Sequence, residues 1–160
     1  PQLKSKALMS RHVPRSAIYL STAVSLILVL CVNNLLGQTR DHFRGRLSIL
    51  PVDFSTLSSM SGDGTVSAEL EGNTLTIEVE FSGLSSPTTG IEIRNAARGR
   101  RGNVALSFQA GVPKSTAGQF TQSVMLTNTQ RTELHAERYY IQLQTEDNPD
   151  GELRAWLLIQ

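Results

Sequence analysis

Charged and polar side chains recur in three segments that otherwise alternate between apolar and polar residues. Glu92 and Arg94 lie in one segment, and Gln144, Glu152 and Arg154 lie in two others near the C-terminus. If a sheet brings the three segments together, these five side chains form one polar cluster. Opposite charges on neighbouring strands stabilise a sheet by roughly 0.2–1 kcal/mol per pair. The pattern therefore favours a structural ion-pair cluster over a ligand site.

Arginines are concentrated between Arg94 and Arg101. Arg98, Arg100 and Arg101 lie in the sequence RGRRG, in which glycine lets a loop bring guanidinium groups together. Guanidinium groups bind carboxylates, phosphates and anionic head groups. The segment is a candidate anion or partner contact, and a solvated connection between strands is the other interpretation of the same composition.

Residue constellations typical of metal sites and hydrolases are missing from the sequence. A Cu or Zn site built from imidazoles needs several converging histidines, and only His42 and His135 follow the N-terminal apolar segment. A nucleophile elbow needs a G-x-S-x-G sequence, which the chain lacks. We therefore expect no cofactor, no metal and no enzymatic activity.

The stretch from Tyr139 to Ile159 must position the C-terminal part of the cluster. It contains two runs in which every second residue is apolar, the period of a half-buried strand. Asn148-Pro149-Asp150-Gly151 between the runs has the composition of a type I turn. The pattern predicts a hairpin whose inward residues are Ile141, Leu143, Leu153, Ala155, Leu157 and Ile159.

Parity determines the register of this predicted hairpin. Keeping both apolar sets on one face places Leu143 opposite Leu153. Tyr140 then lies opposite Trp156 on the outward face, where both are candidates for a partner contact and Trp156 is expected to be only partly covered. The same outward face carries the polar side chains of the hairpin, which are Gln142, Gln144, Glu152 and Arg154.

The other alternating segments predict further antiparallel strands. Residues 43–50 and 104–108 are predicted as single strands, and residues 66–81 as a hairpin that turns at Glu71-Gly72-Asn73. Thr127 and Gln130 form a capping-box signature, which predicts a short helix over residues 128–136. An all-β, antiparallel Greek-key sandwich or barrel with one short helix fits these elements.

The predicted closing hairpin resembles the chordin-type (CHRD) domain family. Residues 140–145, YIQLQT, and 148–154, NPDGELR, are similar to the family's closing motif, YVNVHT followed by a short loop and PGEIRG. The resemblance extends over nearly everything after residue 40. It implies an immunoglobulin-like or superoxide-dismutase-like barrel.

The same resemblance bears on metal binding, because the family motifs contain histidines. Those positions align with Glu92, Arg94 and Gln144 in this chain, or with Ile91 and Ile93 if the first motif is shifted by one residue. Either alignment removes the imidazoles. The resemblance therefore implies that no Cu or Zn site exists at the family position.

The N-terminal segment resembles an export signal. Basic residues between Lys4 and Arg15 precede Ala17 to Val32, a run without a charged residue. A membrane span needs about 20 apolar residues, a length that is reached only as Ala17 to Leu36. We expect residues 1–38 to be a signal peptide or a helical membrane anchor. Residues 39–160 would then be a periplasmic or extracellular domain.

Composition narrows the function further. The chain is 39% hydrophobic and 18% charged, which is ordinary for one globular domain. Its formal net charge of +1 gives no general attraction to nucleic acid. We expect a non-enzymatic protein-binding or structural accessory module with an unknown protein partner in the cell envelope, such as a component of a larger membrane assembly. A Cu/Zn-binding or redox-related extracytoplasmic domain is the alternative.

Overall fold

The computed structural model describes residues 40–49 and 59–160. These residues belong to one compact unit, Thr39–Gln160. The predicted signal peptide or anchor, residues 1–38, lies outside the described residues. Within the described ranges, no helix has the length and apolarity that a membrane crossing requires.

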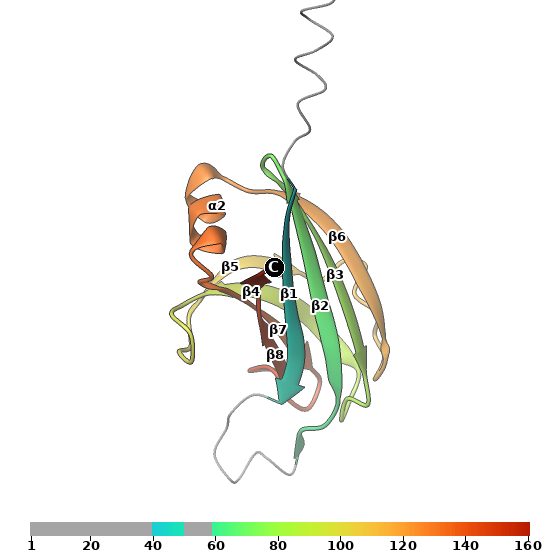
Figure 1. Ribbon diagram of the computed structural model, residues 1–160. Helices are drawn as coiled ribbons and strands as arrows, with labels where there is room; N and C mark the ends of the chain where they lie inside the picture. Colours follow the sequence, from blue (N-terminus) through green and yellow to red (C-terminus); the bar gives the residue numbers. More distant parts are fainter. Residues whose placement is uncertain (1–39, 50–58) are drawn as a thin grey trace, which may run out of the picture. The chain divides into compact units, whose positions relative to one another are not determined.

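The described chain folds into antiparallel strands and one helix. The elements are β1 (Arg40–Ile49), β2 (Asp63–Glu71), β3 (Thr74–Ser82), β4 (Thr88–Asn95), β5 (Asn103–Phe108), β6 (Gly118–Met125), α2 (Asn128–His135), β7 (Tyr139–Thr145), β8 (Leu153–Trp156) and β9 (Leu158–Ile159). One sheet has the order β5-β4-β7-β8-β1-β2-β3-β6, and β9 pairs with β1. The sheet curls into a half-barrel (Figure 1). The prediction of an all-β, antiparallel fold with one short helix is confirmed.

Apolar side chains on the inner face of the half-barrel form its core. Strands β2 and β3 bury every second residue from Val66 to Phe81, as their alternation predicts. Phe43 and Leu47 from β1 and Leu134 from α2 join the same core. The helix begins where the capping box predicts, since the Thr127 hydroxyl accepts from the Gln130 backbone N–H and the Gln130 side chain accepts from the Thr127 N–H.

The hairpin of β7 and β8 has the predicted register. Leu143 pairs with Leu153, and Tyr140 pairs with Trp156. The turn is closed by a hydrogen bond of 3.0 Å from the Gly151 N–H to the Asn148 carbonyl. However, β7 is buried on both faces, so the prediction of a half-buried strand with an exposed outer face is wrong.

Two other predictions need correction. Ile159 does not face the core and is 47% exposed, because the chain leaves β8 after Trp156 and forms the short β9, where Ile159 pairs with Phe43. The alternation of residue types predicts no strand at residues 118–125, where the structure has β6. Only Phe120 is fully buried in this edge strand, so its sequence shows no clear alternation of apolar and polar residues.

Candidate functional site

The outer face of β4, β7 and β8 brings most of the predicted site residues together. In one row across the strands, Glu92 pairs with Gln142, and Gln142 pairs with Arg154. In the neighbouring row, Arg94 pairs with Tyr140 and Tyr140 with Trp156. We call this surface the arginine face, and we include in it Arg101, whose charge acts on Arg154. Its residues are Glu92, Arg94, Arg101, Tyr140, Gln142, Arg154 and Trp156.

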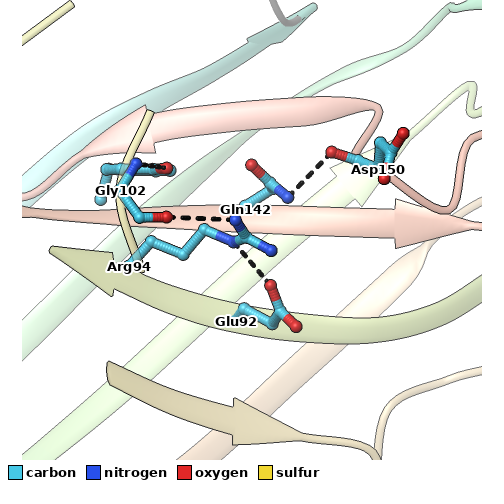
Figure 2. Close-up of polar contacts among 6 residues, drawn as sticks. Glu92, Arg94, Gly102, Gln142 and Asp150 are labelled. Atoms are coloured by element: carbon cyan, nitrogen blue, oxygen red, sulfur yellow. Dashed lines mark hydrogen bonds and ion pairs between the residues drawn. The ribbon is translucent and has the colours of Figure 1, made fainter. Parts of the chain in front are cut away.

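Arg94 ties the loop after β4 to the arginine face. Its Nε donates to the Glu92 carboxylate at 2.7 Å, and its Nη1 donates to the Gly102 carbonyl at 3.2 Å (Figure 2). The Gly102 N–H in turn donates to the Tyr140 hydroxyl at 3.0 Å. A Cβ at residue 102 would lie 1.9 Å from the Asn95 carbonyl oxygen, so the loop can approach this closely only with glycine. Of the five residues of the predicted cluster, Glu92 and Arg94 form an ion pair with each other, along one strand.

This loop also explains why Tyr140 is not the exposed partner contact that parity predicts. The hydroxyl of Tyr140 is bonded under Gly102, and the residue is fully buried. The Trp156 ring packs against the Tyr140 ring with centroids 4.8 Å apart and remains partly exposed. Of the two aromatic residues, only Trp156 can meet a partner at the surface.

Arg154 is the least satisfied residue of the arginine face. The residue is only 8% exposed, and its Nε and Nη2 atoms are buried with no hydrogen-bond partner among the described residues. Its guanidinium carbon lies 4.4 Å from the centroid of the Tyr140 ring, a cation–π contact. The neighbouring Gln142 amide is turned toward the hairpin turn, where its Nε2 donates to the Asp150 carbonyl at 3.0 Å (Figure 2).

The electrostatics around Arg154 are unfavourable for a cation. Burial lowers the pKa of its guanidinium below the ordinary value, and the positive charges of Arg101 and Arg94 lower this pKa further. The Tyr140 side chain acts in the opposite direction. Glu92 is the one acid of the arginine face, and it is already bonded to Arg94. The face therefore carries an excess of positive charge.

Glu152 does not join this group, contrary to the prediction. Its carboxylate is fully buried and accepts five hydrogen bonds from residues of three loops and strand ends. The donors are the Ser61 N–H, the Ser85 N–H and hydroxyl, the Thr145 hydroxyl and the Asn148 side-chain amide. Burial by itself would raise the pKa of Glu152, but the hydrogen bonds from Ser61, Thr145 and Ser85 outweigh it, and the pKa is lowered.

The other predicted site residues are spread around this surface. Gln144 lies opposite Gly90, one row away from Glu92, and is partly exposed. Arg98 pairs with Glu137 at 2.5 Å. Arg100 and Arg101 are exposed and form no ion pair with any residue of the described chain. Among the described residues, Arg101 of the arginine face and its neighbour Arg100 are thus the two arginines of the RGRRG segment without an ion pair.

Neither His42, on β1, nor His135 lies at this site. His135, on α2, has its Nε2 3.6 Å from the Asp41 carboxylate, and its ring packs on Phe43. In the part of the chain that the structure describes, no three His, Cys, Asp or Glu residues are grouped so that they could hold a metal ion.

A comparison with known families adds to this geometry. The model of the CHRD domain family matches residues 51–157, which is more than half of the chain. The chain belongs to the CHRD domain family. No curated protein and no solved structure matches it.

The closing motif of this CHRD domain occupies β7, its turn and β8. Sequence reasoning placed Gln142 on the outward face of this hairpin, but it missed Gly102, which nothing in the sequence marks as a cap on Tyr140. The donors to Glu152 were also missed. They come from segments far apart in the sequence, so no local pattern could identify them.

Proposed function

We propose that this CHRD domain is an exported, non-enzymatic protein-binding module of the cell envelope, held at the membrane by Ala17 to Leu36 if that segment is not cleaved. The observation that carries the proposal is the arginine face, where guanidinium groups outnumber acids beside a partly exposed tryptophan. Charged surfaces steer partners of opposite charge, and Trp and Arg are enriched among the residues that dominate binding energy.

The partner that this surface fits is an acidic protein segment. Arg100 and Arg101 supply exposed charge for the approach, because long-range attraction acts through solvent-exposed groups. Trp156 supplies apolar area at the centre of the contact. Such a contact should weaken as ionic strength rises, since salt screens exposed charges.

We also propose that the half-barrel is related to Greek-key folds of the immunoglobulin-like or superoxide-dismutase-like kind. Its strand order supports this relation. Strands β3 and β6 pair with each other, while β4 and β5, which lie between them in sequence, are at the other end of the sheet. A chain that leaves one part of a sheet for a hairpin elsewhere and then returns is typical of a Greek key.

Capture from envelope extract tests the proposed function. The full chain in detergent is immobilised at low salt, and the double variant Arg100→Glu, Arg101→Glu is compared with the wild type. The matched control is Arg44→Glu, Lys114→Glu, which changes the net charge equally at exposed residues outside the arginine face. We expect a salt-sensitive partner that the first variant loses and the control keeps. Equal capture by both variants would contradict the proposal.

A further inference from the structure

We propose that the free edge of β6 pairs with the β6 edge of a second copy of this chain, so that two half-barrels share one continuous antiparallel sheet. Figure 1 shows β6 at the edge of the sheet, beside β3. Among the described strands, β3 is the one that pairs with it. The inference goes beyond the proposed function, because β6 and the β5 end of the sheet, where the RGRRG segment lies, are at opposite ends of the strand order.

Alternate residues of β6 direct their backbone groups away from the sheet. Just after the strand, the Leu126 N–H donates to the Asn73 carbonyl at 2.7 Å, and the register continues with Met125 opposite Thr74. Hydrogen-bonding direction alternates along an antiparallel strand, so the even-numbered residues of β6 bond to β3. The free edge therefore consists of the backbone groups of the odd-numbered residues, which are all exposed: Gln119, Thr121, Ser123 and Met125.

The Ser123 carbonyl already accepts a hydrogen bond at this edge. Its donor is the side-chain amide of the preceding residue, Gln122, at 3.1 Å. This donor does not compete with the ladder, because the carbonyl points away from β3. In the proposed pair, Gln122 releases the Ser123 carbonyl to a backbone N–H of the second copy.

The β6 edge lacks the charges, prolines and bulges that keep free edges from pairing in natural sheets. No charged residue lies between Lys114 and Arg131, and Gly118–Met125 contains no proline. The register of β6 with β3 has no shift along its length. A neutral edge suits a second copy of itself, because a two-fold axis then brings no like charges together.

The β5 edge, at the other end of the sheet, is protected. Its register with β4 shifts between Ile93 and Arg94, which marks a bulge. Arg100 and Arg101 are exposed just before β5 begins, so two copies that met there would bring like charges together. Pairing through β6 therefore uses the one unprotected edge of the described sheet, and assembly ends at a dimer.

Parity and strand length determine the register of the pair. With Gln122 opposite Gln122 of the second copy, the whole run from Gln119 to Met125 is paired and the inner faces stay on one side. Phe120 then lies opposite Val124 of the second copy. Val124 is partly exposed and Met125 is 77% exposed, so this register covers apolar surface that the single chain leaves open.

Cysteine cross-linking tests this register. Cys31 is replaced by Ala in every variant, and the full chain in detergent micelles is treated with oxidised glutathione. Gln122→Cys brings two thiols into a facing pair whose Cα atoms are about 4.5 Å apart, within reach of a disulfide. Gln119→Cys, also exposed, is the control, because its two copies would lie about 20 Å apart along the strands. We expect a covalent dimer from Gln122→Cys and its loss in Gln119→Cys, and equal cross-linking would overturn the inference.

A charge placed on the edge tests the pairing without cysteines. Thr121→Lys adds the side chain that natural edges use against pairing. The matched control is Thr65→Lys, the same change at an exposed residue of β2, which lies inside the sheet. Light scattering with the detergent mass subtracted should give twice the monomer mass for the wild type and Thr65→Lys, and the monomer mass for Thr121→Lys. A wild type that is monomeric at every concentration, or a dimer that Thr121→Lys leaves intact, would overturn the inference.

A strand of another protein at this edge would give a different result. If the wild type is monomeric and Thr121→Lys loses an envelope partner that Thr65→Lys keeps, the edge binds that partner and the second copy is wrong. The proposed function fails separately, because Arg100→Glu, Arg101→Glu leaves β6 unchanged. A dimer that forms as expected while no envelope partner is captured would support the pairing and contradict the proposed function.

Discussion

Glu152 and Arg154 lie two residues apart in the closing motif, and the fold treats their buried charges differently. The Glu152 carboxylate receives five hydrogen bonds, whereas the Arg154 guanidinium leaves two of its nitrogens without a partner. The first charge is fully compensated within the chain. The second is compensated only in part, by an aromatic ring. One fold can therefore compensate two charged residues of the same motif to different degrees.

The position of each residue in the sheet accounts for the difference. Glu152 lies just before β8 begins, where loop backbones still have free N–H groups, and those of Ser61 and Ser85 point at its carboxylate. Arg154 lies within β8, between β7 and β1, where backbone carbonyls are used in the ladders. Only another side chain or a ligand can accept from Arg154.

The largest loss of stability is expected at Leu153, which lies between the two charged residues in the sequence. Leu153 is fully buried and packs in the core. Leu153→Ala should lower the free energy of unfolding by about 2–5 kcal/mol, because burial is lost and a cavity remains. Trp156→Ala, on the opposite face of the same strand, should cost less because Trp156 is partly exposed. Urea denaturation measures both variants, and a larger loss for Trp156→Ala would contradict the assignment of the two faces.

Substitution of Glu152, the compensated charge, should lower the stability of the fold strongly. Glu152→Gln replaces an acceptor of five hydrogen bonds by an amide that turns a donor toward other donors, so we expect a loss of about 3 kcal/mol. Glu78→Gln, at an exposed residue of β3, is the control and should change stability by less than about 0.5 kcal/mol. If the two variants had equal stability in urea, the Glu152 network would not stabilise the fold.

The pH dependence of stability provides a second test of whether the Glu152 carboxylate stabilises the fold. The pKa of Glu152 is lowered in the folded state from its ordinary value of 4.5. A group with a lowered pKa stabilises the fold above its unfolded-state pKa, and this contribution is lost as the pH falls through the folded-state value. The wild type should therefore lose stability below about pH 4.5 more steeply than Glu152→Gln. Thermal midpoints between neutral pH and pH 3 measure the difference, and parallel curves would contradict it.

Substitution of Arg154, the uncompensated charge, should change the stability of the fold least. Arg154→Met removes a buried cation that lacks hydrogen bonds and keeps a long apolar side chain over Tyr140. The lost cation–π contact and the relieved burial cost should nearly cancel, so we expect a change within about 1 kcal/mol. A loss as large as that of Glu152→Gln would show that Arg154 is as structural as its neighbour.

Local patterns in the sequence were sufficient for much of the fold. The alternation of Leu143 and Leu153 with polar residues, together with the turn at Asn148-Pro149-Asp150-Gly151, predicts the hairpin register that the structure has. The capping box at Thr127 likewise predicts the start of α2. These features depend on neighbours in sequence, which is why they can be read without a structure. The match to the CHRD family model over residues 51–157 confirms the resemblance that the closing motif suggests.

Only the tertiary structure decided what covers each face of that hairpin. Parity places Tyr140 and Arg154 on one side, but the loop ending at Gly102 buries Tyr140. Ser61 and Ser85, from distant segments, donate to Glu152, which therefore does not join the expected cluster. Periodicity shows which residues share a face, and it contains no information about which remote loop packs on that face. The burial of Arg154 without a partner therefore emerges only from the assembled fold.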